Sequence, residues 1–242
     1  IHAQASSLAD HGIIVTKRAN LQGHRLYQRG VFDIQDEASQ LIIHAIPSNC
    51  ISVIDYCAGA GGKTLQLAST LPHHATIQAC DVRKQALTEL QKRVKRARLP
   101  RVTVHQLEPD REPTNMQSAD CVLVDAPCTG SGVLRRHPHN RHNMAGDALH
   151  RIQHLQTQLL HRAATRVNPH GLLIYATCSL LPSENEQQVA SFLCNHPEFT
   201  LEPIEDWWPA GSVTVGHRGF LRTDPFNHGT DGFFAARLRR TR

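Results

Sequence analysis

Residues 51–64 read ISVIDYCAGAGGKT, a short apolar run that leads directly into a glycine-rich turn. The apolar run has the length of a buried strand, and the residues from about 62 to 69 are predicted to form a helix. Glycines in such a turn let the backbone approach a ligand closely, and the free N–H groups at the start of the helix point toward it. This stretch therefore predicts a strand–turn–helix unit with a ligand at the carboxyl end of its strand.

The same alternation of strands and helices extends along the rest of the chain. Further strands are predicted at residues 75–81, 102–104, 121–124, 172–176, 199–201 and 232–238. Helices are predicted at residues 37–46, around the apolar positions Leu87, Leu90, Val94 and Ala97, at 149–167, and from a capping box at Ser183 and Glu186 to about Cys194. Such βα units predict an α/β, Rossmann-like fold of about seven strands. We expect these to be mostly parallel, with one antiparallel strand and helices on both faces.

Size and composition limit the class of protein. With 242 residues, 40% hydrophobic and 19% charged, the chain is predicted to fold around one large core. No stretch approaches the roughly 18 apolar residues of a membrane span, and the first residues lack the features of a signal peptide. The seven cysteines are odd in number and include no C-x-x-C pair. We therefore expect free thiols in a reducing cytoplasm, without a disulfide framework, a zinc site or a membrane partner.

Basic residues give the chain a formal charge of +5 and gather in three places. These places are a helix with its exit, a loop that also carries three histidines, and the C-terminal end. Their members are Arg83, Lys84, Lys92, Arg93, Lys95, Arg96, Arg98 and Arg101; Arg135, Arg136 and Arg141 with His137, His139 and His142; and Arg237, Arg239, Arg240 and Arg242. This distribution favours a polyanionic partner, although a solvated helix face and a basic tail would give the same pattern.

The glycine turn fits one class of nucleotide-like cofactor better than two others. A phosphate-binding loop requires a glycine where Cys57 stands, and a dinucleotide-binding turn requires one at Thr64. The pattern that remains is the turn of methyltransferases, which surrounds the amino-acid end of S-adenosylmethionine. Asp81 ends the second predicted strand, 22 residues beyond Gly59, where an acidic residue can accept both ribose hydroxyls.

Two cysteines follow the fourth and fifth predicted strands. Residues 125–128 read DAPC and residues 177–179 read TCS, so Cys128 and Cys178 both lie at carboxyl ends of strands. Ligands gather at this edge of an open parallel sheet, and we expect the two thiols to face one cleft. A cysteine is more often a small buried residue than a nucleophile. The occurrence of two beside a cofactor turn is what favours catalysis.

A thiol beside a methyl donor suggests one particular reaction. Carbon 5 of cytosine is too weakly nucleophilic to accept a methyl group directly. A thiolate that adds to carbon 6 increases the electron density on carbon 5, and removal of the carbon 5 proton then releases the thiolate. A carboxyl group such as that of Asp125, hydrogen-bonded to the exocyclic amine and the ring nitrogen, would hold the base. The residue that removes the proton is not identified by the sequence.

From about residue 30 to residue 240 the chain resembles the RsmB/Sun family of RNA cytosine-C5 methyltransferases. The segments that carry the resemblance are residues 32–40, 57–64, 125–132, 135–138, 175–179, 184–186 and 231–234. The resemblance implies the class I fold of S-adenosylmethionine-dependent methyltransferases and a ribosomal RNA substrate. A transfer RNA substrate and a non-catalytic RNA-binding assembly factor on the same fold are the alternatives. DNA cytosine methyltransferases carry their nucleophile in a Pro-Cys pair, which would leave residues 177–178 unexplained.

The resemblance also implies a role for each site residue. Cys178 is the implied nucleophile, Cys128 assists release of the methylated RNA, and Asp125 and Lys63 contact the target cytosine. The residues implied to hold S-adenosylmethionine are Cys57, Ala58, Gly59, Ala60, Gly61, Gly62, Lys63, Asp81, Glu108 and Asp125.

Two features depart from the family pattern. Gly59 and Ala60 stand where the family commonly has Ala-Pro, and both Glu108 and Asp110 could be the acidic residue after the third strand. We favour Glu108. Residues 1–30 are expected to be the tail of an N-terminal RNA-binding module, and residues 31–242 to form the catalytic domain of a monomer.

Overall fold

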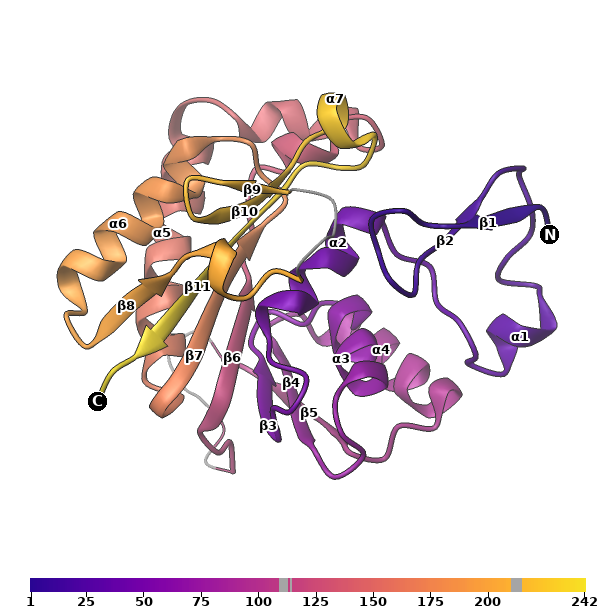
Figure 1. Ribbon diagram of the computed structural model, residues 1–242, viewed down its shortest axis with the longest axis horizontal. Coiled ribbons are helices and arrows are strands. Elements are labelled where there is room, and N and C mark those ends of the chain that lie inside the picture. Colours follow the sequence, from indigo (N-terminus) through magenta and orange to yellow (C-terminus); the bar gives the residue numbers. More distant parts are fainter. Residues whose placement is uncertain (109–112, 114, 210–214) are drawn as a thin grey trace.

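The computed structural model describes residues 1–108, 113, 115–209 and 215–242, and within them a nine-stranded sheet forms the centre of the molecule (Figure 1). Five neighbouring strands are parallel, in the order β5-β4-β3-β6-β7. They are β3 (Ser52–Asp55), β4 (Thr76–Asp81), β5 (Val102–Gln106), β6 (Ala119–Asp125) and β7 (Val167–Thr177). The strand order reverses between β3 and β6, so their carboxyl ends flank the crevice where open α/β sheets bind ligands.

Four further strands extend the sheet beyond β7 by antiparallel pairing. They are β8 (Phe199–Glu202), β9 (Gly216–His217), β10 (Phe220–Thr223) and β11 (Phe233–Arg240). β11 lies against β7 with Phe234 opposite Thr177, so the start of β11 borders the carboxyl end of β7. The predicted fold class is confirmed, but the predicted number of about seven strands is too low. β9 and β10 are too short to produce a recognisable hydrophobic pattern.

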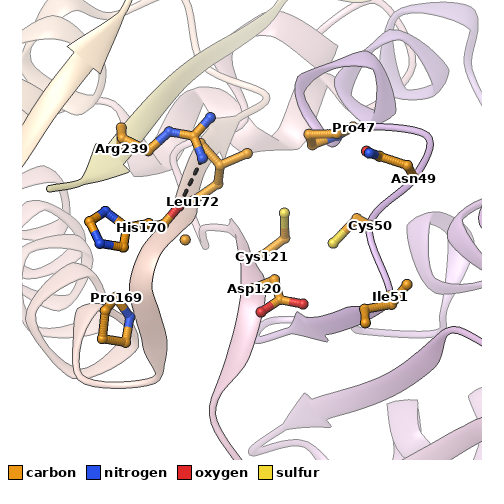
Figure 2. Close-up of a pocket in the computed structure, with 11 residues that line it drawn as sticks. Pro47, Asn49, Cys50, Ile51, Asp120, Cys121, Pro169, His170, Leu172 and Arg239 are labelled. Atoms are coloured by element: carbon orange, nitrogen blue, oxygen red, sulfur yellow. Dashed lines mark hydrogen bonds between the residues drawn. The ribbon is translucent and has the colours of Figure 1, made fainter. Parts of the chain in front are cut away.

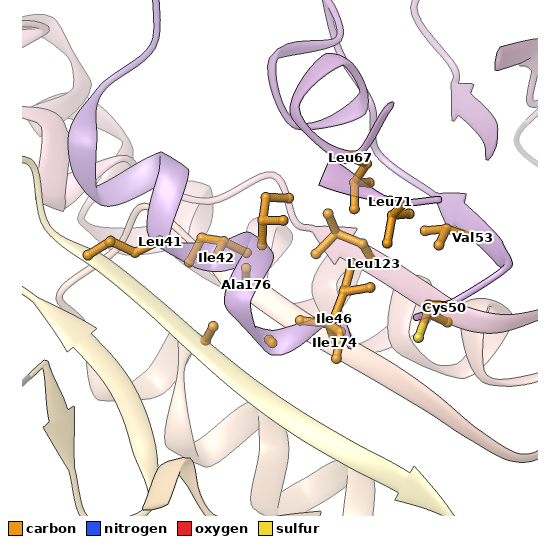
Figure 3. Close-up of a cluster of buried hydrophobic side chains, with 14 of the residues drawn as sticks. Leu41, Ile42, Ile46, Cys50, Val53, Leu67, Leu71, Leu123, Ile174 and Ala176 are labelled. Carbon is orange, nitrogen blue, oxygen red and sulfur yellow. The ribbon is translucent and has the colours of Figure 1, made fainter. Parts of the chain in front are cut away.

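Helices cover both faces of the sheet. One face packs against α2 (Glu37–Leu41), the 3-10 helix η1 (Ile42–Ala45), α3 (Gly62–Thr70) and α4 (Lys84–Ala97). The other face packs against α5 (Gly146–Ala164) and α6 (Glu186–Asn195). Figure 3 shows part of the first core, where apolar side chains of α2, η1 and α3 meet those of β3, β6 and β7. In the ranges described, no helix is both long and apolar enough to cross a membrane.

Two predicted boundaries are wrong. β7 begins at Val167, five residues before the strand predicted at 172–176, so residues 168–171 also belong to the strand. α6 begins at Glu186 and no side chain caps it, so the predicted capping box at Ser183 is absent. Residues 182–184 form a short 3-10 helix, η4 (Pro182–Glu184), instead. Side chains in this segment bond to neighbouring loops, and these tertiary bonds replace the local cap.

The N-terminal segment stands outside the βα repeat. It contains a hairpin of β1 (Ala3–Ala5) and β2 (Ile13–Val15) and one turn of helix, α1 (Arg25–Gln28). It contacts α4 where the Arg96 guanidinium lies 4.0 Å from the centre of the Tyr27 ring. Asp33 forms ion pairs with Arg93 at 3.0 Å and with Arg96 at 2.7 Å. The expectation that residues 1–30 belong to an RNA-binding module stays a prediction.

Candidate active site

The glycine turn after β3 is fixed by its neighbours. The Ala58 N–H donates to the Cys80 carbonyl of β4, and the Gly61 N–H donates to the Ala58 carbonyl, both at 2.8 Å. Gly61 directly precedes α3 with φ of 88°, and a Cβ there would lie 2.8 Å from Leu90 Cγ. Only glycine meets both requirements, because other residues rarely adopt positive φ and would collide with α4. The Ala60 carbonyl accepts from Arg93 Nη1 at 2.7 Å, which holds the outer side of the turn.

Asp55, at the end of β3, is a fully buried carboxyl group beside this turn. Thr64 Oγ1 donates to Asp55 Oδ2 at 2.6 Å, whereas Asp55 Oδ1 has no hydrogen-bond partner among the described residues. Burial raises the pKa of Asp55 to about 7, against the lowering effect of the Thr64 hydrogen bond. Desolvation and the charges of Asp81 and Asp55 also raise the pKa of Cys57, so this residue of the turn remains a thiol.

Asp81 ends β4 next to the turn and is 4% exposed. The Gly59 N–H donates to Asp81 Oδ2 at 2.8 Å, and Arg83 donates to the carboxylate through Nε at 3.0 Å and Nη2 at 2.9 Å. Burial opposes ionisation, but the hydrogen bonds from Arg83 and Gly59 lower the pKa of Asp81 overall. The Arg83 side chain is 66% exposed and can move away. Ribose hydroxyls could then donate to the same carboxylate.

These residues fit the amino-acid and ribose parts of S-adenosylmethionine. A Cβ on Gly62 would meet only the Gln35 amide within 4 Å, so the open side of the turn has room for a ligand. The unpaired Asp55 oxygen and the ionised Asp81 supply acceptors on the same edge of the sheet. Glu108, the predicted adenine contact, follows β5 and has an exposed side chain. Its alternative, Asp110, lies outside the described residues.

Cys128 and Cys178 meet at the carboxyl edge of the sheet. Their sulfur atoms are 3.3 Å apart, close enough for one thiol to donate a hydrogen bond to the other. β6 and β7 bring them together, because Asp125 pairs with Ala176 in the parallel register and each cysteine lies shortly beyond its strand. The sequence predicts both thiols in one cleft, and the structure places them in contact.

The two thiols have opposite tendencies to ionise. The hydrogen bond with Cys128 lowers the pKa of Cys178, and the positive charge of Lys63 acts in the same direction. The same hydrogen bond, together with burial, raises the pKa of Cys128. Cys178 is therefore the thiol that more readily becomes a thiolate, the form in which sulfur is a nucleophile. Cys128 retains the proton that the pair shares.

Lys63 and Asp125 form an ion pair beside the thiols. Lys63 Nζ lies 2.7 Å from Asp125 Oδ2 and donates to Ser39 Oγ at 3.0 Å. It also lies 4.9 Å from the centre of the Phe233 ring. Lys63 is 6% exposed and Asp125 31%, so the carboxylate faces the open side of the site. The first turn of α3 thus brings one residue of the glycine turn into contact with the end of β6.

Glu184 is a site residue to which the sequence analysis assigned no role. It is fully buried, and its carboxylate accepts from the Thr129 N–H at 2.8 Å, from Thr129 Oγ1 at 2.5 Å and from Gln156 at 3.0 Å, and also from the Ser179 hydroxyl. The available signal was a pair of polar residues, Glu184 and Asn185, shortly after Cys178. Residues 184–186 are also among the segments that carry the family resemblance.

Two acidic residues, Asp231 and Asp36, also had no predicted role. They lie against the loop from Arg135 to His142. Arg136 donates to the fully buried Asp231 through Nε at 2.7 Å, and Arg135 Nη2 lies 3.4 Å from the same carboxylate. Burial and the nearby Asp231 raise the pKa of Asp36, which lies 4.0 Å from Arg135. The loop continues into the 3-10 helix η3 (Pro138–Asn143), whose basic side chains are exposed.

Most of the other basic residues, on the helix with its exit and at the C-terminal end, bind acidic side chains or carbonyl groups of the protein itself. Arg93 and Arg96 bind Asp33, and Arg101 donates to the carbonyl of Leu71 at the end of α3. At the C-terminal end, Arg237 and Arg239 both pair with Glu202, each at 2.6 Å. The loop from Arg135 to His142 keeps exposed positive charge, and its Arg136 acts electrostatically on Cys178.

A second pair of cysteines lies at the opposite edge of the sheet. Cys50 precedes β3 and Cys121 is near the start of β6, and both line a pocket of about 260 Å³ with Asp120, His170 and Arg239 (Figure 2). Cys50 Sγ donates to the Ser52 carbonyl at 3.4 Å, and the interaction of the two thiols lowers the pKa of Cys50 and raises that of Cys121. This pocket is at the amino ends of the parallel strands and is separate from the candidate active site.

Comparison with known proteins identifies the family. Residues 43–239 match the family model described as 16S rRNA methyltransferase RsmB/F. The chain belongs to the RsmB/F methyltransferase family. The resemblance expected from the sequence motifs is thereby confirmed, and the family and fold together confirm S-adenosylmethionine as the cofactor.

Individual relatives cover nearly all of this RsmB/F chain but extend well beyond it. The chain is 29% identical to the probable ribosomal RNA small subunit methyltransferase B of Bacillus subtilis, with 99% of this chain and 54% of the relative covered. It is 31% identical to the ribosomal RNA small subunit methyltransferase F of Serratia proteamaculans, with 87% and 45% covered. The chain thus spans about half the length of these curated relatives.

A solved structure agrees with this assignment. The crystal structure of NSun6 from Pyrococcus horikoshii with SFG has a TM-score of 0.77 and 28% sequence identity to this RsmB/F chain. The match covers 93% of this chain and 57% of the neighbour.

Proposed function

We propose that this chain methylates carbon 5 of a cytosine in RNA, with Cys178 as the covalent nucleophile. The observation that carries the proposal is the 3.3 Å contact between the thiols of Cys128 and Cys178, beside the Lys63–Asp125 ion pair and at the edge that holds the glycine turn. A nucleophilic thiol, a second thiol and a carboxylate are the groups that this reaction needs. Membership of the RsmB/F family and the names of its ribosomal RNA methyltransferase relatives support RNA as the substrate.

The methyl donor would be held by the turn and by Asp81. The Gly59–Gly62 turn would enclose the amino-acid end of S-adenosylmethionine, and Asp81 would accept from its ribose. The neighbour solved with SFG, an analogue of this cofactor, supports such a site. When bound, S-adenosylmethionine supplies an electrophilic methyl group on a sulfonium centre. The role of Glu108 as the adenine contact remains part of the proposal.

Attack begins at Cys178. Its thiolate adds to carbon 6 of the cytosine, and the electron pair of the C5=C6 bond becomes available at carbon 5. Asp125 would accept from the exocyclic amine of the base, and the Lys63 ammonium, 2.7 Å from Asp125, would hold that carboxylate in place. Asp125 ends β6 and Lys63 lies in the first turn of α3, so the base can be oriented without rearrangement of the backbone.

Release requires removal of the carbon 5 proton, and we assign this step to Cys128. In the free site the hydrogen bond with Cys178 raises the pKa of Cys128. Once the Cys178 sulfur is bonded to carbon 6 it is a neutral thioether, so that influence is lost and Cys128 can give its proton to solvent. The Cys128 thiolate then takes the carbon 5 proton, the C5=C6 bond re-forms and the bond from carbon 6 to Cys178 breaks.

The RNA would approach over the loop from Arg135 to His142. Arg135 and Arg136 are 54% and 47% exposed even though they bind Asp231, so they can also contact phosphate groups. A paired target cytosine would have to leave its helix to reach the thiols, and enzymes that act on bases often flip them out. A ribosomal RNA target is the first choice, with transfer RNA as the alternative substrate.

Trapping of the covalent intermediate tests the proposal. Cys128→Ala should accumulate a protein–RNA adduct with small-subunit ribosomal RNA and S-adenosylmethionine, visible as a band retarded in denaturing gels. Cys178→Ala should form no adduct and transfer no methyl group, while still binding the cofactor in calorimetry. An adduct with Cys178→Ala but not with Cys128→Ala would reverse the two roles. Equal methylation of DNA, or RNA binding without methylation by the wild type, would reject the proposed function.

A further inference from the structure

Glu184 joins the two segments that carry the thiols. It follows β7 by several residues and lies at the end of η4, yet it reaches back to the loop after β6. Its contacts are with Thr129, the residue next to Cys128, and with Ser179, the residue next to Cys178. Each thiol is therefore one residue away from a group bonded to the same carboxylate. A buried carboxylate with four donors is firmly held, because release of any one donor leaves a polar group unsatisfied.

Strand pairing within the sheet does not fix the positions of Cys128 and Cys178. β6 ends at Asp125 and β7 at Thr177, so both cysteines lie beyond the last residues of the two paired strands. Backbone hydrogen bonds from Ala126 to Ala176 at 2.8 Å and from Gly132 to Cys178 at 3.0 Å restrain the ends of the Cys128 loop. Between them, the Glu184 carboxylate is the group that binds the backbone N–H of Thr129, directly after Cys128.

We propose that Glu184 is a positioning residue, which keeps the thiols of Cys128 and Cys178 in contact by joining the segments that carry them. Its catalytic meaning rests on the proposed function, but the contact itself is a property of the protein alone. Asn185 acts alongside it on the Cys178 segment, donating to the Ser179 carbonyl at 2.8 Å and accepting from Thr177 Oγ1 at 2.6 Å.

The charge of Glu184 adds an asymmetry to this geometry. It lies near Cys128 and contributes to the raised pKa of that thiol, after the effects of Cys178 and of burial. Cys178 is faced by Lys63 and Asp125, and Arg136 also acts on it electrostatically. The carboxylate thus favours the arrangement in which Cys128 keeps the proton and Cys178 is the thiolate.

Two substitutions separate the contacts from the charge. Glu184→Gln keeps an oxygen for the Thr129 N–H and for Gln156, and its amide can donate to the two hydroxyls, which can reverse their direction. Glu184→Ala removes all of these contacts. Glu186→Ala is the matched control, because Glu186 is in the same segment. Its carboxylate binds Arg222 at 3.0 Å and not the cysteine segments.

Disulfide formation measures the contact without RNA or cofactor. The purified chain is treated with diamide, which accepts the two hydrogens of a thiol pair, and the Cys128–Cys178 disulfide is quantified by peptide mass spectrometry over time. The Cys50–Cys121 pair at the opposite edge of the sheet is the internal reference. Glu184→Ala should lower the rate for Cys128–Cys178 relative to this reference by at least about tenfold, whereas Glu184→Gln and Glu186→Ala should stay within about threefold of wild type.

An unchanged ratio in folded Glu184→Ala protein would overturn the proposal, because a carboxylate that only stabilised the fold would not alter it. If Glu184→Ala does not fold, as judged by circular dichroism, Thr129→Val decides. That variant removes one donor and leaves the carboxylate in place, and it should lower the ratio by about threefold; no decrease would again overturn the proposal.

Methyl transfer gives the second measurement. Glu184→Ala should reduce kcat with little change in KM for RNA, and Glu184→Gln should recover most of the loss, as expected for misplaced thiols rather than weaker RNA binding. Equal losses in Glu184→Gln and Glu184→Ala would contradict positioning by hydrogen bonds. If the wild type itself transfers no methyl group, the proposed function fails, while the disulfide ratio still tests the positioning role.

Discussion

One pair of cysteines lies at the carboxyl ends of the parallel strands and another at their amino ends. The thiol pKa values are perturbed in the same way in both pairs. Cys128 and Cys178 meet at the carboxyl ends of β6 and β7, and Cys50 and Cys121 meet near the amino ends of β3 and β6. In each pair the interaction between the thiols lowers the pKa of one and raises that of the other. A perturbed thiol pKa therefore does not distinguish a catalytic pair from a structural one.

The surroundings of the two pairs differ. The carboxyl edge has the glycine turn, the Lys63–Asp125 ion pair and the exposed arginine loop. At the amino edge Asp120 accepts from Ser52 Oγ at 2.7 Å and from Asn168 Nδ2 at 2.9 Å. Polar groups there satisfy one another, whereas those at the carboxyl edge include a buried oxygen of Asp55 that has no hydrogen-bond partner in the described part of the chain. The difference shows that the neighbouring groups, more than the thiols, point to the reactive site.

The largest expected effect separates the two pairs directly. Cys178→Ala should lower methyl transfer by at least about a thousandfold, because the nucleophile is lost, while Cys50→Ala should leave it within about threefold of wild type. Tritium transfer from labelled S-adenosylmethionine to RNA measures both. Similar losses in the two variants would remove the distinction between the edges.

The next effect concerns stability and pH. Because the folded pKa of Asp55 is about 7 and the unfolded value is 3.8, the folded state binds more protons between these values. The stabilisation that Asp55 provides therefore falls by up to about 4 kcal/mol as pH rises from about 4 to 7. Above that range it is constant. Urea unfolding at several pH values should show this decrease in wild type and in Asp120→Asn, and not in Asp55→Asn. A decrease that persists in Asp55→Asn would contradict the assignment.

Lys63 provides a test of the electrostatics at the carboxyl edge. Lys63→Met should lower kcat/KM at pH 7 by about a hundredfold, through loss of the charge that favours the Cys178 thiolate and of the partner of Asp125. Since Lys63 lowers the pKa of Cys178, its removal should raise that pKa and move the rise of activity to higher pH. Arg239→Met, near the other pair, should leave the pH profile in place. A Lys63→Met profile at the wild-type position would argue against this role.

The smallest expected effect compares two arginines. Arg141 is exposed in the loop from Arg135 to His142, whereas Arg240 donates to the Val167 carbonyl at 2.6 Å. Arg141→Ala should weaken RNA binding and reduce the slope of log affinity against log salt by about 1, as for loss of one phosphate contact. Arg240→Ala should leave the slope unchanged. Fluorescence anisotropy with labelled RNA at several salt concentrations measures both, and equal slopes for the two variants would exclude Arg141 as a phosphate contact.

Local sequence patterns were sufficient for the part of the site built on strand ends. The apolar run of β3 and the glycines after it predict the cofactor turn, and the cysteines after β6 and β7 follow from the rule for parallel sheets. The same approach did not predict β9 and β10, which are short, or the start of α6. It also counted Arg93 and Arg96 among the residues for a polyanion, although both bind Asp33.

What the sequence determined by itself was the order of βα units, the position of the glycine turn and the placement of two cysteines just after predicted strands. These depend on hydrophobic period and on residues adjacent in the chain, so the information is local. Only the tertiary structure decided that the two thiols are 3.3 Å apart, that Glu184 joins their loops and that a similar pair lies at the far edge. Glu184 and Thr129 are 55 residues apart, and a hydrogen bond over that separation forms only when the sheet has brought the two loops together.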